Sequence, residues 1–128
     1  MRPRLRKGFT LIELLIVCVI LGILAAIVTL NFRNTKGKAN ATSMKSDLRN
    51  LATAQESYFF ENGVYTTSAA ALVYIKSPGV TVAIGAADAG GWRAEATHPQ
   101  AWPLVCYVFV GNKGPNGPAT VEGAIACR

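Results

Sequence analysis

The side chains that could carry chemistry are few and widely spaced. The 128-residue chain has one histidine, three cysteines and seven acidic residues. No two carboxylates share a strand face or a helix turn, so the paired acid and base of most hydrolytic mechanisms are absent. His98 precedes Pro99 at the end of a predicted strand, and Cys106 and Cys127 lack the close spacing of zinc modules. We therefore expect a protein that is not an enzyme and that has no metal site and no cofactor.

Apolar residues and positive charges are both concentrated near the N-terminus. The chain is 51% hydrophobic with a formal charge of +6. In residues 9–30, 18 of 22 side chains are apolar, and four basic residues precede them: Arg2, Arg4, Arg6 and Lys7. The rest of the chain has nine basic and seven acidic residues. This distribution argues against a free soluble enzyme, a disordered chain and a strongly basic nucleic-acid-binding protein.

Residues 9–30 have the length of a membrane-spanning helix. At about 1.5 Å per residue they extend roughly 33 Å, close to the thickness of a hydrocarbon core. The preceding basic cluster favours a cytoplasmic N-terminus with residue 31 onward outside. Glu13 lies within the apolar run, where a carboxylate costs about 2.5 to 3.5 kcal/mol at mid-membrane depth. This cost argues against two alternatives, a disposable signal cut near Ala25 and Ala26 and a plain anchor.

The beginning of the apolar run resembles a known family. Residues 6–17, RKGFTLIELLIV, resemble the N-terminus of type IV pilins and pseudopilins, and the likeness continues through residues 22–27. The resemblance implies a leader of residues 1–8, a cut by a prepilin peptidase between Gly8 and Phe9, and methylation of Phe9 by the same enzyme. It implies that Glu13 pairs with the amino terminus of an adjacent subunit. Gly22 marks where such helices loosen in filaments, although Leu30 stands where many members have proline.

Beyond the membrane segment the pattern predicts a continuing helix and then strands. Residues 31–62 have core-type positions at spacings of three and four, and Gly63 can end the helix. Residues 69–74 predict a short helix capped by Thr67 or Ser68. Alternating or apolar runs predict strands at these ranges: 80–84, 92–98, 104–110 and, more weakly, 119–127. The expected fold is α+β, with a long helix (9–62) packed on an antiparallel sheet of three or four strands in a globular domain (63–128).

The cysteines fit this topology. Cys106 and Cys127 lie in the part expected outside the cytoplasm, where disulfides persist. We expect them to pair and to close a C-terminal loop, as in many pilins, while Cys18 serves as a small apolar residue of the membrane segment. The glycine-rich residues 111–118 predict a flexible surface loop.

The resemblance implies a structural function. The precursor would wait in the inner membrane, lose its leader, and join copies of itself and related minor pilins through an inner-membrane assembly platform. Packing of residues 9–30 against other copies would bury their apolar surface again in an extracellular filament. Alternatives are a periplasmic pseudopilin of a type II secretion system, and a minor pilin that acts as an adhesin or a DNA-uptake receptor. Pseudopilins often hold calcium near the C-terminus, where this chain has only Glu122, and its dispersed charge argues against nucleic acid.

Overall fold

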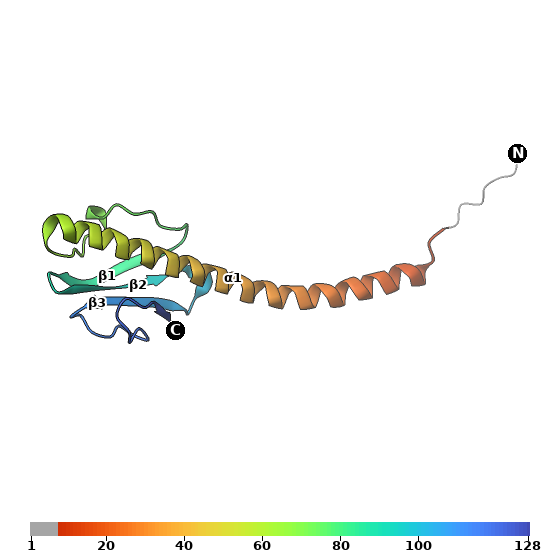
Figure 1. Cartoon of the computed structure of the whole chain (residues 1–128). Coiled ribbons are helices and arrows are strands. Elements are labelled where there is room, and N and C mark those ends of the chain that lie inside the picture. The colour runs from red at the N-terminus through yellow and green to blue at the C-terminus, as the bar shows by residue number, and fades with distance from the viewer. Residues whose placement is uncertain (1–7) are drawn as a thin grey trace, which may run out of the picture. The chain divides into compact units, whose positions relative to one another are not determined.

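The computed structural model describes residues 8–128, except for the side chains of residues 29–34. The expected leader, apart from Gly8, and the side chain of Leu30 therefore lie outside the description. The elements, in chain order, are α1 (Leu11–Asn62), a 3-10 turn (Ala69–Ala71), β1 (Thr81–Asp88), β2 (Gly91–Thr97), a second 3-10 turn (Pro99–Ala101), β3 (Val105–Gly111) and β4 (Ala126–Cys127) (Figure 1). The chain divides into two compact units, Met1–Thr35 and Lys36–Arg128. We call the second unit the head.

The sheet of the head is antiparallel throughout. Its strand order is β1-β2-β3-β4, so each strand pairs with its neighbour in sequence. The small residue Ala94 pairs with Ile84 on one side and with Val108 on the other. The predicted α+β fold, a long N-terminal helix with a small antiparallel sheet, is confirmed.

The core of the head lies between α1 and the sheet (Figure 1). On α1, Met44, Leu48 and Leu51 recur at helical spacing and are completely buried. On β2, Trp92 is also completely buried, while the alternate residues Arg93 and Glu95 are exposed on the other face. The buried face of the helix, with a period of 3.6 residues, therefore packs against the buried face of the strand, with a period of two, in one core.

Two buried polar side chains of α1 bind the segment that follows it. Gln55 is completely buried; its Nε2 donates to the carbonyl of Thr66 at 2.6 Å, and the Thr66 N–H donates to its Oε1 at 3.0 Å. Asp47, only 1% exposed, accepts hydrogen bonds from the backbone N–H and the hydroxyl of Ser77 at 2.7 and 2.9 Å. These four bonds fasten residues 63–80 to the helix, although that segment contains no strand and only one 3-10 turn.

The predicted helix at residues 69–74 is wrong. Only Ala69–Ala71 form a 3-10 turn, and the side chain of Ser68 makes no capping hydrogen bond. Leu72 is extended, and the chain after it has no regular secondary structure: Leu72 is buried, whereas Val73 and Ile75 are 98% and 86% exposed. Three alanines are too short a run to offset the cost of helix nucleation, while alternation lets one side of the segment pack on α1.

The C-terminal region is also more fixed and less strand-like than predicted. Instead of a fourth strand over 119–127, only Ala126–Cys127 pair with β3. The expected flexible loop at 111–118 is held to the sheet, because Asn116 Nδ2 donates to the carbonyls of Ala94 and Val108 at 3.1 and 3.3 Å. Within the loop itself, the backbone of Asn116 exchanges two 3.0 Å hydrogen bonds with the buried Ala119.

Candidate assembly site at the N-terminus

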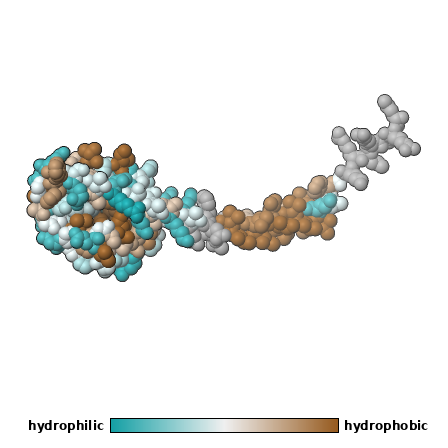
Figure 2. All heavy atoms as spheres, in the orientation of Figure 1, coloured by the Kyte–Doolittle hydropathy of each residue, from teal (hydrophilic) through white to brown (hydrophobic). Residues whose placement is uncertain are grey.

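The first part of α1 presents an apolar surface with no intramolecular cover. Leu11–Val28 is long and apolar enough to cross a membrane, and none of it is buried within the chain. Each of its large apolar side chains keeps 46% to 81% of its surface exposed. In Figure 2 apolar residues cover most of the visible surface here, whereas polar and apolar residues are mixed over the head. A surface of this kind requires lipid or other protein helices around it.

Glu13, the only charged residue in this apolar stretch, takes part in the N-terminal cap of α1. Thr10 immediately precedes the first helical residue, and its N–H and hydroxyl donate to Glu13 Oε2 at 3.0 and 2.8 Å. In return the Glu13 N–H donates to Thr10 Oγ1 at 3.3 Å. The sequence T-x-x-E is the signature of this reciprocal capping box, and sequence reasoning missed it. The carboxylate is thereby fixed in the first turn of the helix, where the helix dipole favours negative charge.

The structure brings some of the predicted N-terminal site residues together. Gly8 and Phe9 directly precede the capping box and are exposed, Phe9 by 81%. Gly22 lies further along α1, where a Cβ would meet nothing within 4 Å. The helix continues through Gly22 without interruption. Cys18 has a free, exposed thiol in the same apolar stretch.

The two cysteines of the head form a disulfide. Cys106 on β3 and Cys127 on β4 are directly opposite each other in the strand pairing. Next to them Val105 and Arg128 exchange two backbone hydrogen bonds of 2.9 and 3.0 Å. The end of the chain is thus held to β3 by one covalent bond and by backbone pairing.

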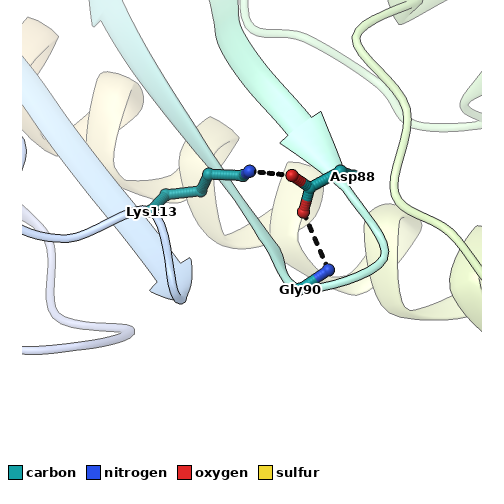
Figure 3. A network of polar contacts seen from close by, with 3 residues as sticks. All are labelled: Asp88, Gly90 and Lys113. Atoms are coloured by element: carbon teal, nitrogen blue, oxygen red, sulfur yellow. Dashed lines mark hydrogen bonds and ion pairs between the residues drawn. The ribbon is translucent and has the colours of Figure 1, made fainter.

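An ion pair links the β1–β2 turn to the segment after β3 (Figure 3). Asp88 Oδ2 pairs with Lys113 Nζ, and Asp88 Oδ1 accepts a hydrogen bond from the Gly90 N–H at 2.8 Å. The hydrogen bond from Lys113 lowers the pKa of the Asp88 carboxyl below its usual range, and the bond from the Gly90 N–H adds to this effect. Among the described residues, no group of three or more His, Cys, Asp or Glu side chains could hold a metal ion. The positive charge that pairs with Asp88 comes from Lys113.

Comparison with known proteins identifies the family. Residues 3–29 match the prokaryotic N-terminal methylation motif. The chain is 40% identical over 96 residues to the type IV wide pilus major component PilA4 of Thermus thermophilus, a match that covers 72% of this chain and 73% of that protein. This chain belongs to the type IV pilin family. The family predicted from residues 6–17 is confirmed.

Other relatives of this pilin fall into two groups. The type IV major pilin protein PilA of Myxococcus xanthus is 47% identical over 64 residues, which are 50% of this chain and 29% of that protein. The type II secretion system core protein G of Klebsiella michiganensis is 40% identical over 68 residues, 53% of this chain and 48% of that protein. The matched regions thus span less than half the length of these two relatives. The names describe components of pili and of a secretion system.

Proposed function

We propose that this pilin is a structural subunit of a type IV pilus, cut between Gly8 and Phe9 and assembled through its apolar N-terminal helix. The observation that carries the proposal is the surface of Leu11–Val28, which is apolar on all sides except at Glu13. Such a surface is unfavourable in water and requires lipid or other helices around it. A subunit that leaves lipid to pack beside its own copies meets this requirement.

The apolar surface requires assembly once the helix leaves lipid, and Glu13 directs that assembly. Each square ångström of apolar surface left in water would cost about 25 cal/mol, so helices drawn out of lipid must pack side by side to bury that surface again. A carboxylate enclosed by such helices is costly without a partner. Cleavage before Phe9 would create an ammonium group four residues before Glu13, next to the cap of α1. Pairing of Glu13 with that group of an adjacent subunit would fix the register between them.

The proposed location and partners follow from this route. The precursor would span the inner membrane with residues 1–8 in the cytoplasm and the head outside. A prepilin peptidase would cut it and methylate Phe9, and an inner-membrane assembly platform would add it to a filament with related minor pilins. The disulfide between Cys106 and Cys127 supports an oxidising location for the head. The filament would then extend outside the cell.

A second candidate is a pseudopilin of a type II secretion system. The identity to core protein G favours it. The identity to PilA4 extends over 72% of this chain, against 53% for core protein G, and this longer match favours a pilus. Shearing of intact cells separates the two candidates: surface filaments rich in peptides from residues 36–128 indicate a pilus, and a protein retained in the periplasm indicates a pseudopilus.

Processing can be tested on the mature protein. We expect mass spectrometry to find N-methylated Phe9 as the first residue, since the leader pattern ends at Gly8. Gly8→Leu should leave uncut precursor in the membrane. An N-terminus near Ala26, or an intact leader in the wild-type protein, would contradict the proposed cut.

The role of Glu13 can be tested with two variants. One removes both its charge and its hydrogen bonds to Thr10, and the other removes only the charge. Glu13→Ala should leave mature monomer at normal levels in the membrane and give few or no filaments, because the register contact is lost. Glu13→Gln keeps an oxygen that can accept from Thr10 but carries no charge, so it should fail in the same way. Cys18→Ala, in the same apolar stretch, is the control and should assemble. Wild-type filament yield from Glu13→Gln, with cleavage intact, would rule out the charge pairing.

A further inference from the structure

The head has an open groove with one acidic residue. It lies between α1 and residues 71–75 and has a volume of about 550 Å³. Asn50, Ser57 and Glu61 line its helical wall, and the exposed side chains of Val73 and Ile75 line the other. No basic side chain lines it, and Glu61 makes no ion pair with any residue that the structure describes. The groove therefore combines an apolar wall with an unneutralised negative charge.

A basic stripe lies on a different face of the same helix. Lys38, Lys45 and Arg49 are spaced by seven and four residues, so they project from one side of α1. Lys38 and Arg49 are exposed, and Lys45 is half-buried. None of the three makes an ion pair with a described residue. The stripe thus carries positive charge, whereas the groove carries the negative charge of Glu61.

A chain cannot place its own basic stripe in its own groove. Arg49 and Glu61 are twelve residues apart on one rigid helix, which separates them by about 18 Å along the axis and about a third of a turn around it. A second copy, displaced along the filament, can bring the two surfaces together. Because the contact joins two different surfaces, every pair of copies still has one free stripe and one free groove. The contact can therefore repeat without limit.

The geometry points to an interface between copies of this pilin, in which the basic stripe of one head lies in the groove of the next. The aliphatic stems of Lys45 and Arg49 cover Val73 and Ile75, and their charged ends face Glu61. Opposite charge favours this pairing and disfavours other registers. The interface rests on the proposed function, since it forms only where copies assemble side by side.

Cross-linking between neutral positions tests the contact without removing its charges. Thr42 lies between Lys38 and Lys45 on the stripe, and Ser57 lines the groove. In a Cys18→Ala background, filaments of Thr42→Cys/Ser57→Cys treated with a short bifunctional maleimide should give a ladder of dimers, trimers and larger species. Each single-cysteine chain should stay monomeric. Assembled filaments without a ladder, dimers from one single variant, or cross-links only to a different protein would each overturn the interface.

A charge exchange tests its energetics. Glu61→Arg and Arg49→Glu should each lower filament yield about tenfold, since each places like charges together. Combined in one chain, they recreate the opposite pair, and yield should recover to near the wild-type level. Glu95→Arg, an exposed charge on the outer face of β2, is the matched control and should assemble normally. No loss in the single variants, or no recovery in the double variant, would overturn the proposal.

Failure of this interface differs from failure of the proposed function. If the wild-type chain forms filaments but the cross-links and the charge exchange give negative results, only the groove contact is wrong. If the wild-type chain enters no filament, both the proposed function and the interface fall.

Discussion

Asp88 and Lys113 form an ion pair between the ends of two strands that are not paired with each other in the sheet. Asp88 ends β1 and Lys113 follows β3, and the two strands are not neighbours in the sheet. Lys113 is the more enclosed partner, with 18% of its side chain exposed against 55% for Asp88. Because the hydrogen bonds stabilise the charged carboxylate, the pKa of Asp88 is lowered in the folded head.

The lowered pKa gives a pH dependence of known sign. The ion pair stabilises the head fully above the unfolded-state pKa of about 3.9, and this contribution is lost as pH falls through the lower folded-state pKa. Lys113→Met should raise the pKa of Asp88 towards its usual value, which an NMR titration of the carboxyl carbon would measure. Lys45→Met, on α1, should leave it unchanged. An unaltered Asp88 pKa in Lys113→Met would contradict the role given to the lysine.

Some single-residue features could be predicted from the sequence and others could not. The T-x-x-E cap at Thr10 and Glu13 is local, so its signal was present in four consecutive residues. Asp47 and Gln55 are different, because their partners lie 30 and 11 residues away in a segment without periodicity. Periodicity placed Gln55 on the packed face of the helix, but only the folded backbone of Thr66 explains why a polar residue is suitable there.

At the level of elements, long periodic segments were predicted well and short ones were not. The expected helix 9–62 and the observed Leu11–Asn62 differ only at the start, where the cap at Thr10 sets the boundary. The three main strands lie within a residue or a few residues of the predicted ranges. The fourth strand is short because Asn116, Ala119 and the Cys106–Cys127 bond hold the C-terminal segment in place of a strand ladder.

The disulfide should therefore contribute much of the stability of the C-terminal region. It closes a loop with a sequence separation of 21 residues, for which chain entropy gives about 3 kcal/mol. Cys106→Ala/Cys127→Ala should lower the free energy of unfolding by about that amount, measured by denaturant titration of the purified protein in detergent. Cys18→Ala should have no such effect. Reaction of both head cysteines with a thiol reagent before reduction would show that the bond is absent.

At the level of the whole molecule, two units have opposite solvent requirements. In the unit ending at Thr35, the large apolar side chains of Leu11–Val28 are exposed, whereas the head buries a continuous set that includes Met44, Leu48 and Trp92. All members of that core belong to residues 36–128. The part of α1 inside the head thus supplies one layer of a closed core, while its earlier part depends on surroundings outside the chain.

Residues 36–128 should therefore fold alone as a soluble monomer, and the full mature chain should need detergent or copies of itself. The fragment keeps the core, the disulfide and both polar contacts of α1, so little stability is lost with the apolar helix. In a Trp102→Phe background, which removes the 77% exposed tryptophan, the buried Trp92 should give blue-shifted fluorescence in both fragment and full chain. Size-exclusion chromatography would show the monomer. An aggregated fragment, or a water-like Trp92 emission, would mean that the head needs the N-terminal part of α1 to fold.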